Sequence, residues 1–140
     1  MDEWLAPVCS PHYAREHGLL EAAHNLSGAT VLHDTLAWPA CAPDAEWRLW
    51  LEGRAPEVSL SARSLRFDRA DLCAQAAIHH AGVAMGRRQL VQPWIDSGQL
   101  VLPFREVALA SPQAYYLVHA ARTLPARVQA LLDWLMGQAI

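Results

Sequence analysis

Two short stretches bring acidic and basic side chains together, each where a strand is predicted to end. In "RFDRAD", Asp68 and Arg69 follow a predicted strand, and Asp71 stands three residues after Asp68. In "VLHD", His33 and Asp34 close another predicted strand. Doubly wound sheets bind ligands at such strand ends. An acid beside a base suits a small amino acid, because its ammonium group prefers Asp and its carboxylate prefers Arg.

The first of these turns also has a purely structural explanation. Asp68 is expected to be the N-cap of the next helix, with Asp71 placed as in a capping box. Backbone N–H groups at a helix start can donate hydrogen bonds to a carboxylate of a ligand, although a capping aspartate competes for them. In this alternative, Arg69 is only solvated and the turn binds nothing. The residues alone leave both interpretations open.

Other chemistries lack a complete set of residues. Cys9 and His12 have a C-x-x-H spacing, and His79 and His80 are adjacent, but neither pair has the second half that a metal site needs. His80 is expected at the packed edge of its helix. No serine stands in a G-x-S-x-G motif. We therefore expect no metal, no cofactor and no catalytic residue.

Phosphate and nucleic-acid binding are also disfavoured. The turn at Phe67, Asp68 and Arg69 holds no glycine to cradle a phosphate, and Asp68 would repel one. Arg87 and Arg88 are expected to form a solvated helix start. The net charge is −3 and the isoelectric point is about 6.1, whereas a domain that binds nucleic acid usually exceeds about 9.

Composition suits a soluble domain that covers part of its surface with a partner. The chain has 140 residues, of which 53% are hydrophobic and 18% charged, below the roughly 25% charge of typical soluble domains. Three separated cysteines, Cys9, Cys41 and Cys73, predict reduced thiols and a cytoplasmic location. We see no secretory signal and no run near the ~20 apolar residues that span a bilayer, so no membrane association is expected.

Strands and helices are predicted to alternate along the chain, which is typical of a mostly parallel sheet with helices on both faces. The expected strands are Trp4–Ser10, Ala29–Asp34, Val58–Phe67, Val83–Gly86, Gln99–Phe104 and Ala114–Ala120. The expected helices are Pro11–His17, Leu20–Leu26, Ala45–Glu52, Asp68–Ala81, Arg87–Gly98 and Leu124–Gln138. Gly82 is expected to stop the fourth helix. Thr123 is expected to cap the last one, with Pro125 in its first turn.

Taken together, several of these stretches resemble a known family. The pattern "FDRADLCAQAAIHHAGVAMGRRQLV…GQLVLPF", with "PVCSP", the W-x-x-W of Trp47 and Trp50, and "YYLV", resembles the effector-binding domain of LysR-type transcriptional regulators. The resemblance covers essentially the whole chain. The stretches "VLHDTLAW", "EWRLW", "RFDRADL" and "GVAMGRRQLV" are particularly similar to members that respond to D-serine.

The resemblance implies an α/β fold. It consists of a Rossmann-like lobe of the type II periplasmic-binding-protein kind, with a mixed, mostly parallel sheet, plus a partial second lobe. Residues 1–10 would form a crossing strand, and residues 11–104 the second lobe of the effector-binding domain. Residues 105–140 would form the return crossing and the last strand and helix of the first lobe. The winged helix-turn-helix domain that contacts DNA is absent from this stretch.

The resemblance also implies a function. The effector would be a small molecule, D-serine or a similar amino acid, and the chain would not be an enzyme. The candidate ligand-binding residues are His33, Asp34, Phe67, Asp68, Arg69 and Tyr115. We expect a homodimer or a swapped oligomer, because the last strand and the stripe Val128, Leu131, Leu132 and Leu135 would otherwise be exposed. DNA would be contacted only through the absent N-terminal domain.

Two alternatives belong to other classes. A small α/β enzyme of amino-acid metabolism would need an acid–base pair with a nucleophile or a cofactor, which the sequence does not offer. A solute-binding protein for uptake shares the two-lobe architecture but would need an export signal.

Overall fold

The computed structural model describes residues 3–21, 23–104, 108–119 and 123–138. Within these ranges one mixed sheet has the strand order β3-β2-β4-β1-β5. The strands are β1 (Trp4–Val8), β2 (Val31–Asp34), β3 (Ser64–Phe67), β4 (Val83–Arg87) and β5 (Leu109–Ala110). β2 pairs in parallel with β3 and β4, and β1 lies antiparallel between β4 and β5. The expected α/β fold with a mixed sheet is confirmed.

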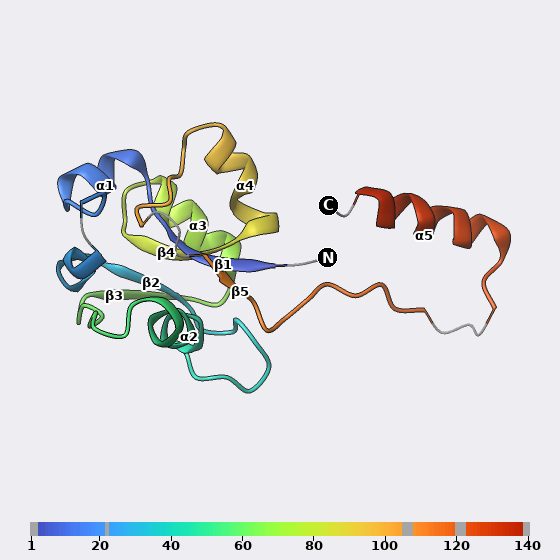
Figure 1. Cartoon of the computed structure of the whole chain (residues 1–140), viewed down its shortest axis with the longest axis horizontal. Helices are drawn as coiled ribbons and strands as arrows, with labels where there is room; N and C mark the ends of the chain where they lie inside the picture. Colours follow the sequence, from blue (N-terminus) through green and yellow to red (C-terminus); the bar gives the residue numbers. More distant parts are fainter. Residues whose placement is uncertain (1–2, 22, 105–107, 120–122, 139–140) are drawn as a thin grey trace.

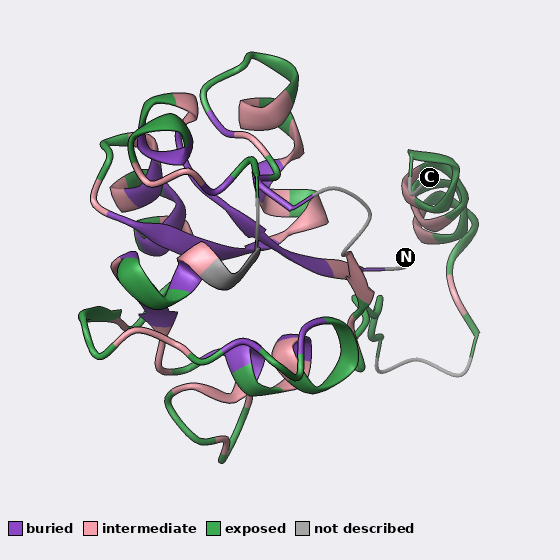
Figure 2. Cartoon of the chain, turned by 60° about the vertical axis from the view of Figure 1, so that its left-hand side comes forward, coloured by how far each residue is buried: buried purple, intermediate pink, exposed green. Residues whose placement is uncertain are grey.

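Helices cover both faces of this sheet. They are α1 (Pro11–Glu16), α2 (Ala45–Arg54), α3 (Ala70–Ile78) and α4 (Arg88–Asp96), with a 3-10 helix η1 at Ala23–Gly28. A further helix, α5 (Ala126–Gln138), has no buried residue. Figure 1 shows α2 on one side of the sheet and α3 with α4 on the other. Each side has its own apolar cluster, with Trp47 and Trp50 of α2 in one, and Cys73 and Ala77 of α3 in the other. The sheet is therefore the middle layer of three (Figure 2).

The β1 strand begins the fold and is almost completely buried. Leu5 and Val8 are 0% exposed and belong to the two different apolar clusters. Ser10 then starts α1, because its hydroxyl accepts a hydrogen bond from the backbone N–H of Tyr13 at 3.1 Å. The strand is antiparallel to β4 through the register that pairs Leu5 with Arg87. This register brings the first described residues beside the carboxyl end of β4.

Three predictions around α3 are corrected. Its N-cap is Arg69 rather than Asp68, and no side chain caps it. The helix ends at Ile78, where His80 takes a positive φ of 64°, so Gly82 does not stop it. Gly82 is instead required by packing, because a Cβ there would overlap the backbone oxygen of Thr30. His80 is exposed rather than packed, and its Nδ1 lies 2.6 Å from the Ser10 hydroxyl oxygen.

Several strand predictions were too long. The stretch Val58–Phe67 forms a strand only over β3, and Gln99–Phe104 contributes only an isolated bridge between Val101 and Cys9. Residues 114–119 form no strand, and Ala120 lies outside the described residues, as does Arg105, where the return crossing was predicted to begin. A strand needs a neighbour for its backbone hydrogen bonds, and residues 114–119 have no such neighbour within the described part of the chain.

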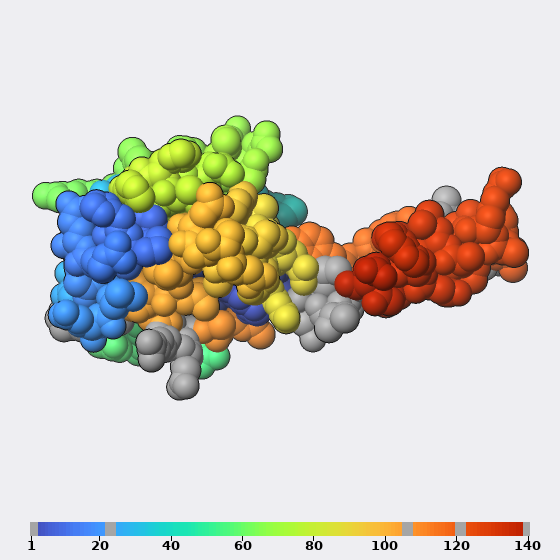
Figure 3. All heavy atoms as spheres, turned by 90° about the horizontal axis from the view of Figure 1, so that it is seen from above, coloured from blue at the N-terminus to red at the C-terminus, as the bar shows by residue number. Residues whose placement is uncertain are grey.

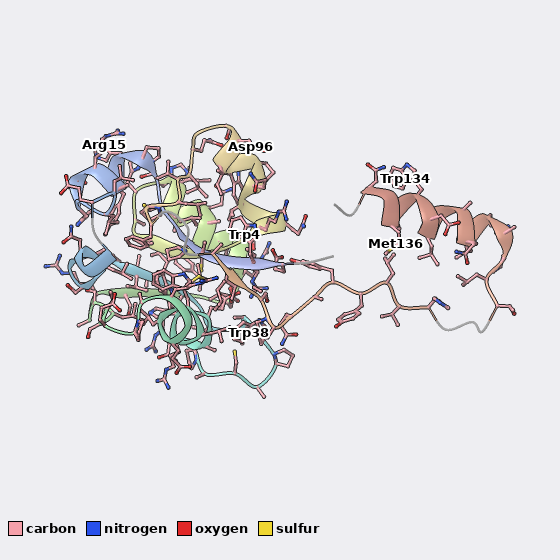
Figure 4. The ribbon with its side chains drawn as sticks, viewed as in Figure 1. Trp4, Arg15, Trp38, Asp96, Trp134 and Met136 are labelled. Atoms are coloured by element: carbon pink, nitrogen blue, oxygen red, sulfur yellow. The ribbon has the colours of Figure 1, made fainter. Side chains whose placement is uncertain are left out.

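The last helix stands apart from the sheet at the end of this extended segment (Figures 1 and 3). α5 begins at Ala126, one residue after Pro125, so Pro125 is not inside its first turn as predicted. No residue of α5 is buried. Leu131 is 53% exposed and Trp134 is 60% exposed. Figure 4 shows Trp134 on the side of α5 that faces away from the extended segment.

Candidate functional site

Arg87 connects three elements at the carboxyl end of the parallel strands. Its Nε donates to Oε1 of Glu46 at 2.9 Å, and its Nη2 donates to the carbonyl oxygen of Ala37 at 3.0 Å and toward Oδ2 of Asp34 at 3.5 Å. Asp34 ends β2, Arg87 ends β4, and Glu46 lies in the first turn of α2. The parallel pairing of β2 with β4 puts their ends side by side. The prediction that Arg87 is solvated is therefore wrong.

This cluster is shielded from water. The side chains of Glu46, Asp34 and Arg87 are 4%, 7% and 21% exposed. Burial raises the pKa of Glu46, and the charge and hydrogen bond of Arg87 only partly oppose that rise. Ionising Glu46 inside the fold is therefore costly, and the positive charge of Arg87 reduces that cost.

A pocket of about 200 Å³ opens beside this cluster. Its wall is formed by Glu3, residues 37–39, Arg87, Ser111 and residues 113–115. The wall therefore combines the start of β1, the loop after β2, the end of β4 and the segment that follows β5. Figure 4 shows Trp38 of the loop beside the start of that segment.

Glu3 and Tyr115 are the two ionisable residues that the chain's beginning and its return segment give to the pocket. Glu3 is 7% exposed, and its Oε1 accepts from the backbone N–H groups of Trp4 at 3.2 Å and Gln89 at 3.3 Å. Its Oε2 has no hydrogen-bond donor among the described residues. The pKa of Tyr115 is raised, first by partial burial and then by the negative charge and the hydrogen-bonding proximity of the Glu3 carboxylate, although no hydrogen bond of full geometry reaches its Oε2. Tyr115 therefore faces the pocket as a neutral phenol.

The structure separates His33 from Asp34. Neighbouring strand residues point to opposite faces, and His33 lines a second pocket of about 400 Å³ with Asp44, Arg48 and Arg66. The Nδ1 atom of His33 is buried without a partner among the described residues, and burial lowers its pKa. Of the predicted site residues, Tyr115 lines the first pocket. Asp34 lies beside that pocket, because it contacts the lining residue Arg87.

The predicted turn lines neither of the two pockets described here. The carbonyl oxygen of Phe67 accepts from the backbone N–H and the hydroxyl of Thr35, at 2.8 and 2.9 Å. Arg69 donates twice to the carboxylate of Asp71, at 2.9 and 2.6 Å, and Asp68 is exposed. Contact of these residues with an effector stays a prediction.

Sequence reasoning missed Glu3, Glu46 and Arg87. The position of Arg87 was available as a signal, because it directly follows the strand predicted over Val83–Gly86, and strand ends of a doubly wound sheet are where ligands bind. The pairing of Arg87 with Glu46 was not available, since the two residues are 41 positions apart.

Several other reactive side chains in the described chain are not available to a ligand or a metal ion. No three His, Cys, Asp or Glu side chains among the described residues are placed to hold a metal ion. Burial raises the pKa of Cys9 and of Cys73 to about 12, so both thiols stay protonated. Ser10 approaches His80 but is 1% exposed, so its hydroxyl acts in the helix cap. None of the helices in the described ranges is long and apolar enough to cross a membrane.

Comparisons with known proteins place the chain in a family. The family model for the LysR substrate binding domain matches residues 1–139. The chain is 42% identical over 99% of its length to the HTH-type transcriptional regulator DsdC of Escherichia coli, and 30% identical over 98% to the glycine cleavage system transcriptional activator of the same species. The chain belongs to the LysR substrate-binding domain family.

The chain covers only part of these relatives. It spans 44% of the DsdC sequence and 43% of the glycine cleavage activator. The effector domain of the transcriptional regulator AmpR of Pseudomonas aeruginosa superimposes with a TM-score of 0.71 at 24% identity, over 99% of this chain and 62% of that one. The AmpR effector-binding domain of Citrobacter freundii gives 0.65 at 19% identity, over 96% and 62%. These structures show the fold, and the curated relatives are transcriptional regulators.

Proposed function

We propose that this chain is the effector-sensing part of a LysR-type transcriptional regulator, and that its effector is a small amino acid such as D-serine. The pocket that combines Glu3, Arg87 and Tyr115 is the observation that carries the proposal. Its volume of about 200 Å³ is smaller than the roughly 300–1,000 Å³ of sites for drug-sized ligands, so it suits a molecule of a few heavy atoms.

The choice of D-serine rests on the resemblance and on the pocket's chemistry. An acidic group and hydroxyl groups, from Glu3, Ser111 and Tyr115, meet in one small wall, which suits a ligand that carries an ammonium group and a hydroxyl. One relative is the transcriptional activator of the glycine cleavage system, whose name refers to another small amino acid.

We propose the same layout that the resemblance implies. Residues 1–10 form a crossing strand, residues 11–104 a lobe, and residues 105–140 the return crossing with the end of the other lobe. The antiparallel position of β1 between β4 and β5 supports this layout, because strands at the chain's beginning and its return lie side by side there. A ligand held between the lobe and the return segment favours one arrangement of the two, which is how such a sensor signals.

The regulator would work as a homodimer or swapped oligomer in the cytoplasm, with DNA contacted by a separate domain. Support for self-association comes from apolar side chains on the return segment and α5. Tyr116 is 81% exposed, Val118 is 91% exposed, and Met136 is 61% exposed. Several large exposed apolar side chains of this kind are typical of a protein–protein interaction surface.

Backbone amide NMR tests the location of the site. With D-serine added to the ¹⁵N-labelled chain, the amide signals of Ala37, Ser111 and Gln113 should shift in a saturable manner. The amides of Ser64 and Arg66, which line the second pocket, serve as the internal control and should not move. Shifts confined to Ser64 and Arg66 would place the effector elsewhere, and no shift anywhere would remove D-serine.

A further inference from the structure

The guanidinium of Arg87 has little charge left for a ligand. It donates to Glu46 at 2.9 Å and toward Asp34 at 3.5 Å, and both carboxylates are almost completely buried. Two buried carboxylates around one guanidinium more than neutralise it. Arg87 is therefore a structural centre of the pocket wall and a poor receptor for the carboxylate of a ligand.

Glu3, unlike Arg87, has a buried polar atom without a hydrogen-bond partner among the described residues. The Glu3 side chain lines the pocket, and the residue is only 7% exposed. Its Oε1 accepts the backbone hydrogen bonds of Trp4 and Gln89. The Oε2 atom is left without a donor in the described chain. A buried carboxylate oxygen without a donor is expensive, so its natural complement is a cation or a strong donor brought by a ligand.

The described ionisable groups around Glu3 do not supply that cation. Tyr115 stays neutral because its pKa is raised, and Arg87 is already shared by Glu46 and Asp34. Glu3 and Arg87 line the same pocket, and Arg87 is paired behind the wall with Glu46 and Asp34, so when all four groups are ionised three carboxylates and one guanidinium leave an excess of two negative charges at this place. Such a wall attracts a protonated amine and repels an isolated carboxylate.

We propose that Glu3 binds the protonated amine of the ligand and makes this pocket select ligands by their ammonium group. The inference rests on the proposed function, in which the pocket holds a small amino acid. It goes further by assigning selectivity to one residue and by removing Arg87 as the reader of the ligand's carboxylate. The Tyr115 side chain interacts with the Glu3 carboxylate, and a bound ammonium group takes its place, because Tyr115 is 52% exposed and has room to turn.

Two small probes separate the amine from the carboxylate. Ethanolamine keeps the amine and hydroxyl of serine without its carboxylate, and glycerate keeps the hydroxyl and carboxylate with a hydroxyl in place of the amine. In thermal unfolding of the 140-residue chain at matched ionic strength, saturating ethanolamine should raise Tm by about 5 °C, and glycerate should not. Equal shifts with both probes, a larger shift with glycerate, or no shift with either would overturn the proposal.

The Glu3→Gln variant tests the residue itself. Its amide oxygen still accepts from Trp4 and Gln89, so the fold should survive, which circular dichroism checks. The variant should unfold at a higher temperature than the unmodified chain without ligand, because an uncompensated charge is gone, and it should lose the ethanolamine shift. Tyr115→Phe should keep that shift. A full ethanolamine shift in Glu3→Gln would overturn the assignment. No D-serine binding alongside a Glu3-dependent ethanolamine shift would instead reject the proposed effector alone.

Discussion

Arg87 at the end of β4 donates to Glu46 in the first turn of α2 across 2.9 Å. This hydrogen-bonded ion pair connects α2 to the carboxyl end of β4, where Arg87 lines the pocket. The Ala37 carbonyl accepts from the same guanidinium at 3.0 Å and so fixes the loop after β2 beside Arg87. Stability and site geometry therefore depend on the same residue.

Replacing Arg87 should destabilise the fold strongly. Arg87→Met leaves Glu46 and Asp34 as buried carboxylates without their cation, and breaking such a pair costs about 3–5 kcal/mol. We expect the lower end, since Arg87 keeps 21% exposure. Urea unfolding measures the change, with Arg88→Met as the matched control, because Arg88 forms no ion pair with the described residues. Equal losses in the two variants would show that the cluster adds no stability.

The raised pKa of Glu46 predicts a pH effect of definite sign. A carboxyl group whose pKa is higher in the folded state than its ordinary value of 4.5 contributes stability below that value and loses it as the pH rises. Glu46→Gln has no such titration. The free energy of unfolding of the unmodified chain should therefore fall relative to that of the variant as the pH rises above 4.5. Chemical denaturation across this interval checks the sign, and a difference that grows in favour of Glu46 would contradict it.

Gly82 should not tolerate a side chain. The added Cβ of Gly82→Ala would overlap the backbone oxygen of Thr30, and backbone cannot move aside as a side chain can. Overpacking of this kind costs about 1–3 kcal/mol. Gly28→Ala is the control, because nothing lies within 4 Å of its added Cβ. Thermal unfolding should show a lower Tm for the first variant only, and an unchanged Tm there would refute the packing role.

The exposed apolar surface of α5 should bring two chains together. Light scattering at micromolar concentration should give twice the mass of the chain. Trp134→Glu, which places a charge on the side chain that is 60% exposed, should return the protein to a monomer. Gln129→Lys on the same helix is the charge control, because lysine keeps a donor for the carboxylate of Asp133, and it should stay dimeric. A monomer in the unmodified protein would reject self-association through this surface.

The sequence predicted the sheet better than its edges. The β2 and β4 strands follow from short apolar runs, which hold because the sheet buries both faces, and α2 begins at Ala45 as predicted. Residues 114–119 were predicted as a strand from their composition, but composition does not provide the neighbouring strand that would complete it. Asp34 and Tyr115 were recognised as candidates, whereas Arg87 was missed because its partner Glu46 is remote in sequence.

The most direct test of the account is calorimetric titration of D-serine into the 140-residue chain. We predict a saturable heat with one site per chain. Ala114→Trp, which fills the pocket from the exposed return segment, should abolish that heat, and the exposed Ala62→Trp should keep it. Arg69→Ala decides between the pocket and the predicted turn, and an affinity within about twofold keeps the site at the pocket, because Arg69 is paired with Asp71 outside it. A tenfold loss in Arg69→Ala would move the site to the turn at residues 67–69. No heat with the unmodified chain would contradict the central claim.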